Sequence, residues 1–174
     1  VVHKANVFRL SDGLFLEAVR AVRNEFPDFE YEEQIVDAMA ALLIRDPAQF
    51  DVIVTTNMYG DILSDEASEI AGSLGMAASL NAGEHFAMAQ AQHGSAPSLA
   101  GQDIANPSSL IGSAAMLLRW IAKRHDAPHF VLAAKAIESA ISTAVANPRT
   151  RTGDLGGKLG TNAYTDKLLE IIDK

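Results

Sequence analysis

Two aspartates near the middle of the sequence, Asp61 and Asp65, carry the most direct chemical signal. They lie four residues apart, and on a helix this spacing places both side chains on one face with Cβ atoms ~5–6 Å apart. Carboxylates this close repel each other, and a divalent cation that prefers oxygen ligands, such as Mg²⁺ or Mn²⁺, would relieve the repulsion. The alternative is that Asp61 caps a helix and Asp65 complements its dipole. Their position after a predicted buried strand, where α/β proteins place ligands, favours a site.

A lysine close to the start of the sequence, Lys4, is a second candidate. If residues 1–8 form a strand, the two-residue period of the strand turns Lys4 and Asn6 to the same side. A lysine beside a metal-bound substrate can act in proton transfer. The alternative is a solvent-facing lysine on an edge strand.

The segment HGSAP at residues 93–97 is rich in small residues, which let a ligand approach the backbone closely. It is neither the GxGxxG fingerprint nor a P-loop, so neither of those nucleotide-binding mechanisms applies. A plain surface loop is the alternative. Further along, Asn106 and Pro107 are residue types preferred at the N-cap and the first position of a helix.

The composition of the 174-residue chain excludes several classes of function. With a net charge of −8 and scattered Lys and Arg, the chain has no basic footprint for nucleic acid. The absence of cysteine excludes disulfides and thiolate sites and fits a reducing cytoplasm, where we expect the protein to lie. No apolar run approaches the ~18–20 residues of a membrane span, so we expect no membrane partner. Because the sequence opens without Met, we interpret it as a fragment or a processed chain.

The elements that must position these residues alternate between strands and helices, which predicts an α/β fold. The apolar, β-branched run FDVIVTT at residues 50–56 is typical of a strand buried on both faces. Further strands are predicted at residues 1–8, 29–36 and 86–92. Helices are predicted at residues 14–26, 37–45, 62–74, 110–123, 130–146 and 166–172, with turns or loops at 57–61, 75–83, 93–107 and 150–160.

Several short strings, taken in their order and spacing, resemble the metal-dependent β-decarboxylating dehydrogenases that act on isocitrate, isopropylmalate, homoisocitrate and tartrate or malate. The resemblance covers essentially the whole chain, and GDILSD with HGSAP at this separation is its most specific part. The matching strings are HKANV at 3–7, DGLF at 12–15, IVDA at 35–38, YGDILSD at 59–65, HGSAP at 93–97, IANP at 104–107, DLGG at 154–157 and YTD at 164–166.

The resemblance implies the C-terminal half of a two-domain α/β protein with the isocitrate/isopropylmalate dehydrogenase fold. Residues 1–72 would belong to the smaller, dimerisation domain. Residues 73–174 would belong to the larger, cofactor-binding domain. It also implies a homodimer with shared active sites.

The resemblance further implies roles for individual residues. Asp61 and Asp65 would bind Mg²⁺ or Mn²⁺, with Asp37 reaching the same ion from the partner subunit. Lys4 would be the catalytic proton-transfer lysine, and Asn6 would contact substrate and nicotinamide, both in the partner's active site. The cofactor's adenosine would be held by His93, Gly94, Ser95, Ala96 and Asn106, with Ser98 beside its ribose.

The cofactor and the substrate are less closely defined. Ser98 stands where NAD-using members of the family usually carry Asp, but the Lys-aromatic pair favoured by NADP users is also absent. Overall similarity favours NAD, with NADP as the alternative. The reaction implied is oxidative decarboxylation of a 3-substituted malate, a small di- or tricarboxylate 2-hydroxy acid.

The family places its substrate-gripping arginine cluster and a proton-relay tyrosine upstream of the matching region. We therefore expect this polypeptide alone to be inactive, because little here offsets the desolvation of a di- or tricarboxylate. The alternative function is a non-catalytic regulatory subunit or a truncated dimerisation or binding domain. Retention of Asp37, Asp61 and Asp65 argues against that alternative.

Overall fold

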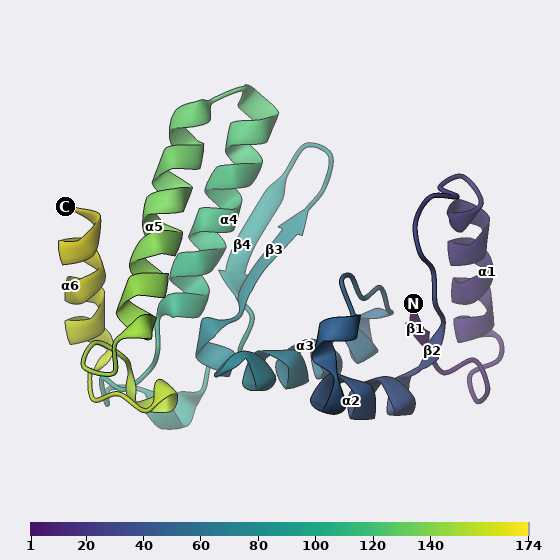
Figure 1. Cartoon of the computed structure of the whole chain (residues 1–174), viewed down its shortest axis with the longest axis horizontal. Helices are drawn as coiled ribbons and strands as arrows, with labels where there is room; N and C mark the ends of the chain where they lie inside the picture. The colour runs from purple at the N-terminus through teal and green to yellow at the C-terminus, as the bar shows by residue number, and fades with distance from the viewer. Residues whose placement is uncertain (174) are drawn as a thin grey trace. The chain divides into compact units, whose positions relative to one another are not determined.

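The computed structural model describes residues 1–173 (Figure 1). Contacts divide the chain into two compact units, Val1–Ile70 and Ala71–Lys174. The boundary predicted after residue 72 lies two residues from this division. The roles of dimerisation and cofactor binding assigned to the two parts stay predictions. Four short 3₁₀ helices also occur among the described residues: η1 (Pro47–Gln49), η2 (Leu74–Met76), η3 (Pro97–Leu99) and η4 (Gly153–Leu155).

The first unit is built around a short parallel pair of strands. Strand β1 (Val2–His3) pairs with β2 (Gln34–Ile35), with Val2 opposite Gln34. Helix α2 (Val36–Arg45) follows β2 without a loop, and α1 (Ser11–Arg23) and α3 (Asn57–Ala71) complete the unit. Apolar side chains from β1, α2 and α3 form its core, namely Val2, Met39, Leu43 and Leu63.

The strand predicted at residues 1–8 is much shorter than expected. It ends at His3, because the Lys4 carbonyl accepts hydrogen bonds from the backbone N–H groups of Val7 at 2.9 Å and Phe8 at 2.8 Å, which closes a turn. The strand period that aligned Lys4 with Asn6 therefore does not apply. The strand predicted at residues 29–36 likewise shortens to β2.

The prediction of a buried strand at residues 50–56 was wrong for the described structure. Its one backbone contact with β1 is a 2.9 Å hydrogen bond from the Val2 N–H to the Val54 carbonyl. Val52 is 77% exposed, and no described strand includes the segment. A strand of a parallel sheet needs partners along its edges and layers over its faces, and the described residues provide one such bond here.

The second unit combines a β-hairpin with three helices. Strands β3 (Ala78–Ala82) and β4 (Ala87–Ala91) pair antiparallel, and β3 replaces the loop predicted at residues 75–83. Small residues let α4 (Ser108–His125) approach the hairpin: a Cβ added at Gly112 would lie 3.2 Å from Ala78. Helix α5 (Pro128–Ala146) lies between α4 and α6 (Thr161–Ile172) in Figure 1. Their core contains Ala140, Ala144, Tyr164 and Leu168.

Helix α5 differs from what the composition predicted about membrane-spanning segments. By length and hydropathy it could cross a membrane, so the expectation that no apolar run approaches a membrane span was wrong. The helix also contains Lys135 and Glu138, and the Glu138 carboxylate accepts two hydrogen bonds from Arg119 of α4. Three of its alanines, Ala134, Ala140 and Ala144, are buried, as expected of a helix that packs between α4 and α6.

Candidate functional site

Lys4 and Asp37, which the sequence assigned to one active site, form an ion pair. The Lys4 Nζ lies 2.5 Å from the Asp37 Oδ1. Lys4 directly follows β1 and Asp37 is the second residue after β2, so the parallel pairing of these strands brings the two residues together. The hydrogen bond from Lys4 lowers the pKa of Asp37. The Asp37 side chain is 70% exposed, so a partner group or an ion can reach it.

Asp61 and Asp65 lie one turn apart inside α3. The helix begins at Asn57, which makes Asp61 its fifth residue, so the alternative that Asp61 caps this helix was wrong. Both aspartates are exposed, whereas Tyr59 and Leu63 on the opposite face of the helix are buried. The start of the helix at residue 57 also replaces the turn predicted at residues 57–61.

Within residues 1–173 no group of three or more His, Asp or Glu side chains is close enough to hold a metal ion. The sequence assigned Asp37 to the ion of the other protomer, so one chain is expected to supply only the pair on α3. The ligand roles of Asp37, Asp61 and Asp65 stay predictions. The chemistry of the pair fits the assignment, because two exposed carboxylates one helical turn apart present hard oxygen donors to one side.

The segment predicted to hold the cofactor lines a pocket of about 880 Å³ in the second unit. His93, Gly94, Ser95, Ala96 and Asn106 all line it. Ser98 does not: it lies on η3, and its carbonyl accepts a hydrogen bond from the Gln102 side chain at 2.5 Å. The remaining lining residues are Ser73, Leu74, Gly75, Leu99, Ala100, Gly101, Asp103, Ile104, Ala105, Asp154, Thr161 and Asn162.

Two features of the pocket's loop suit it to close backbone contact with a ligand. A Cβ built at Gly94 would meet nothing within 4 Å, so the loop is open there. Ala96 adopts a left-handed conformation, with φ 40° and ψ 61°, directly before Pro97. A non-glycine residue in this region is held at a cost of ~1–2 kcal/mol, and such strain concentrates at functional sites.

Both polar atoms of the Asn106 side chain make hydrogen bonds within the protein. Its Nδ2 donates to Asp154 Oδ2 at 3.0 Å, and its Oδ1 accepts from the Ser108 N–H at 3.0 Å. The second bond satisfies the N–H of Ser108, the first residue of α4. The helix begins one residue later than predicted, so Pro107 and not Asn106 is its N-cap.

A family model described as "Isocitrate/isopropylmalate dehydrogenase" matches residues 1–172. The chain belongs to the isocitrate/isopropylmalate dehydrogenase family. It is 47% identical over 174 residues to "3-isopropylmalate dehydrogenase" of Sulfurisphaera tokodaii, covering 99% of this chain and 50% of the relative. It is 41% identical to a mitochondrial regulatory subunit of NAD isocitrate dehydrogenase from Dictyostelium discoideum, covering 98% of this chain and 47% of that protein.

The fold of the family is confirmed by solved structures. The chain superimposes on isocitrate dehydrogenase from Methylococcus capsulatus with a TM-score of 0.92 and 39% identity, covering 99% of this chain and 50% of that one. The chain thus spans about half the length of the isocitrate/isopropylmalate dehydrogenases that it matches.

Sequence reasoning missed three residues that shape the pocket of this family member, beginning with Asp154 and Ser73. Asp154 accepts hydrogen bonds from Ser73 Oγ at 2.5 Å and from Asn106. Burial raises the pKa of Asp154, but these bonds outweigh it, so the pKa lies below its usual value. The DLGG string at residues 154–157 was part of the matching pattern and could have pointed to Asp154.

Asp103 is the third missed residue and fixes the far wall of the same pocket. Its Oδ1 accepts from the Asn162 N–H at 2.9 Å and its carbonyl accepts from the Thr161 N–H at 3.1 Å, which satisfies the start of α6. A Cβ at Gly160 would lie 2.4 Å from that carbonyl, so only glycine permits the approach. Because α6 begins at Thr161, five residues before the predicted start, sequence periodicity did not reveal this cap.

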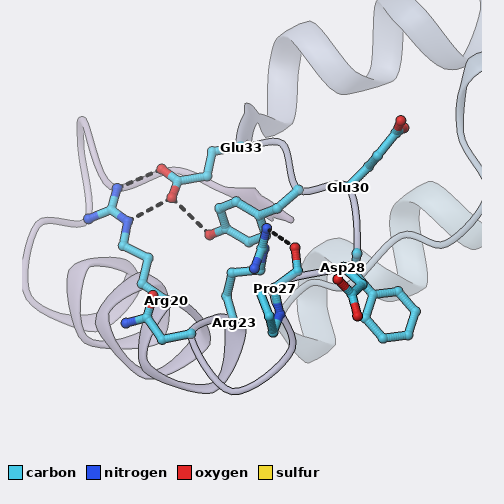
Figure 2. A pocket seen from close by; sticks show the side chains of 9 residues that line it. Arg20, Arg23, Pro27, Asp28, Glu30 and Glu33 are labelled. Carbon is cyan, nitrogen blue, oxygen red and sulfur yellow. Dashed lines mark hydrogen bonds and ion pairs between the residues drawn. The ribbon is translucent and has the colours of Figure 1, made fainter.

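A second pocket, of about 780 Å³, lies in the first unit beside the end of α1 (Figure 2). Arg20 makes two 2.6 Å bonds to Glu33, and Tyr31 donates to the same carboxylate at 2.8 Å. Arg23 donates to the carbonyls of Phe26 and Pro27. Both arginines of this pocket are therefore bonded to groups of the same chain.

Proposed function

We propose that the whole protein containing this chain catalyses NAD-linked oxidative decarboxylation of a 3-substituted malate. The observation that carries the proposal is the 2.5 Å pair between Lys4 and Asp37. These residues are 33 positions apart, and the proposal requires both to enter one active site. Their contact on an exposed part of the first unit is what a shared site predicts.

The residues of this chain would act at two places. Lys4 would exchange a proton with the substrate, and Asn6, which lies in the exposed turn after β1, would orient the substrate beside it. Asp61 and Asp65 would hold the divalent ion of one site, while Asp37 would complete the ion site of the partner protomer. The ion, when bound, would polarise the substrate's hydroxyl and carboxylate oxygens.

The cofactor proposed for the second unit is NAD, with NADP as the alternative. The 880 Å³ pocket is of the size that binds small molecules and cofactors. Its loop of small residues and the backbone of Asn106 would contact the adenosine, and the nicotinamide would accept the hydride. Ser98 would lie outside the main pocket, so its proposed contact with the ribose depends on a ligand that extends across η3.

We propose that a homodimer completes both sites. Several apolar side chains in the turn after β1 and at the start of α1 are strongly exposed in the single chain, including Val7 at 60%, Leu10 at 91% and Leu14 at 67%. Exposed apolar side chains that gather in one region mark interaction surfaces. A second copy would cover them while receiving Lys4 and Asp37. Location in the cytoplasm remains a proposal from the sequence alone.

A regulatory subunit is the competing function, since the chain is 41% identical to the Dictyostelium regulatory subunit as well as 47% identical to a 3-isopropylmalate dehydrogenase. The retained carboxylates on α3 and the intact Lys4–Asp37 pair favour catalysis. The test is turnover by the full-length protein, followed as NADH formation with isocitrate, isopropylmalate, homoisocitrate and tartrate in Mn²⁺. Turnover of one of them supports the proposal. No turnover by a folded, NAD-binding dimer would favour the regulatory function.

The same assay compares the activity of residues 1–174 alone with that of the full-length protein. Residues 1–174 alone should show no turnover under the conditions in which the full-length protein is active. Adding the isolated N-terminal half to this fragment is the matched control, since recovery on mixing would show that the N-terminal half supplies the substrate-binding groups.

A further inference from the structure

A buried carboxylate at the start of α1, Asp12, takes no part in the steps proposed above. Its side chain is 5% exposed. It lies in the first turn of α1, where the helix dipole favours a negative charge. A carboxylate removed from water is costly unless it is hydrogen-bonded, so the partners of Asp12 show what it holds.

The main partner of Asp12 is the backbone of Lys4. The Lys4 N–H donates to Asp12 Oδ2 at 2.6 Å, and Ser11 Oγ donates to Asp12 Oδ1 at 3.2 Å. Because β1 ends at His3, the Lys4 N–H has left the strand ladder, and Asp12 supplies its acceptor. Hydrogen bonds to a charged acceptor are about twice as strong as neutral ones.

The other backbone group of Lys4 is fixed as well. Its carbonyl accepts from Val7 and Phe8, which closes the turn after β1. With both its N–H and its carbonyl held, the Lys4 backbone has one defined position. With the backbone fixed, only the side-chain torsions of Lys4 determine whether its Nζ reaches Asp37, which it does at 2.5 Å.

Asp12 also faces the helix that carries the proposed metal ligands. Tyr59, in the first turn of α3, lies near this carboxylate, since burial raises the pKa of Tyr59 and the charge of Asp12 raises it further. Asp12 therefore bonds to the backbone of Lys4 and lies near the start of the helix that carries Asp61 and Asp65.

We infer that Asp12 is a positioning residue, which sets the place of Lys4 relative to Asp37 and α3. The inference rests on the proposed function, in which Lys4 transfers a proton. Without an acceptor for its N–H, the turn at Lys4 would relax toward solvent and carry the Nζ with it. A displacement of about 1 Å at a reacting group can lower a rate by roughly a hundredfold.

Three variants of the full-length protein test the inference. Asp12→Ala removes the acceptor. Asp12→Asn keeps an oxygen that the Lys4 N–H can reach and removes only the charge. Ser11→Ala is the matched control, because it deletes a neighbouring bond to the same carboxylate and leaves the Lys4 contact in place. For each variant we would measure kcat, KM for the substrate, the Kd for NAD and, in crystals, the distance from Lys4 Nζ to Asp37.

We expect Asp12→Ala to lower kcat by roughly ten- to a hundredfold, with the Kd for NAD unchanged and the Lys4–Asp37 pair broken. Asp12→Asn and Ser11→Ala should stay within about threefold of wild type. An unchanged kcat in folded Asp12→Ala would overturn the inference. So would an equal loss in Asp12→Asn, because the charge and not the backbone acceptor would then be responsible.

Hydrogen exchange of the unaltered protein gives a test that does not depend on a variant folding. The Lys4 amide should be protected although it lies beyond β1, and exchange at the unprotected rate would overturn the inference. Failure of the proposed function is a different result, since wild type would then show no turnover while the crystallographic distance still reports on positioning.

Discussion

The amide of Asn106 donates a 3.0 Å hydrogen bond to Asp154, while its oxygen accepts a 3.0 Å bond from the Ser108 N–H. Ser73 donates to the same carboxylate oxygen at 2.5 Å. Gly75 lies close against Asn106 and Asp154. A Cβ at Gly75 would be 2.7 Å from the Asn106 Cβ and 3.1 Å from the Asp154 Oδ2. The wall of the proposed cofactor pocket is thus a single hydrogen-bonded unit, and Asp154 is the acceptor at its centre.

Replacing Asp154 with Ala should weaken NAD binding to the full-length protein by roughly tenfold. The change leaves the Ser73 hydroxyl and the Asn106 amide without their acceptor, at a cost of ~1–3 kcal/mol, and the backbone of Asn106 loses its fixed position. Calorimetric titration with NAD measures the effect. Asp166→Ala, an exposed carboxylate on α6, is the control and should bind NAD normally. Equal affinities for the two variants would contradict the role of Asp154.

Replacing Asp61 with Asn in the full-length protein should abolish Mn²⁺-dependent turnover while the fold is retained. The amide keeps the shape but halves the negative charge of the α3 pair, and a divalent ion depends on that charge. Because Asp61 lies inside α3 and not at its cap, thermal unfolding should shift little. Glu69→Gln, further along the same helix, is the control. Full activity in Asp61→Asn would show that this carboxylate binds no essential ion.

The Arg20–Glu33 pair should make stability depend on pH in acid. Hydrogen bonding from Arg20 lowers the pKa of Glu33 from 4.5 to about 2. A lowered folded-state pKa means that the stabilisation is complete above pH 4.5 and is lost as the pH falls toward 2. Glu33→Gln should therefore be less stable than wild type at neutral pH, by a modest amount because Arg20 is exposed, and the difference should shrink between pH 4.5 and 2.

Urea unfolding of wild type and Glu33→Gln at a series of pH values measures this dependence. Glu30→Gln is the matched control, since its carboxylate lines the same pocket and makes none of these bonds. A stability difference that grows as the pH falls would contradict the assigned direction.

Features that depend on neighbouring residues were easier to predict from the sequence than contacts between distant segments. The sequence predicted a ligand loop at residues 93–97, and residues 93–96 line a pocket in the structure, while their role in ligand binding stays a prediction. It did not predict that β1 would end at His3, because the turn depends on Asp12, eight residues away from Lys4. The segment at 50–56 has strand composition, but a strand also requires partners, which composition does not reveal.

In the candidate site, too, contacts between distant residues were not predicted from the sequence. The resemblance assigned Lys4 and Asp37 to one active site, but their direct contact follows from strand pairing that no short window of sequence contains. Asp154 and Asp103 escaped notice because their partners lie 48 and 59 residues away. Side chains that hold other functional residues in place carry no motif of their own, so long-range hydrogen bonds were needed to find them.

The central claim is that Lys4 of one chain serves the metal carboxylates of another, and mixing two inactive variants tests it most directly. Full-length Lys4→Ala and Asp61→Asn would be unfolded together and refolded. If the site is shared, each hybrid dimer has one intact site, and about a quarter of the wild-type activity should return when protomers mix at random. Mixed dimers that form, as shown by mass spectrometry, yet remain inactive would contradict the claim.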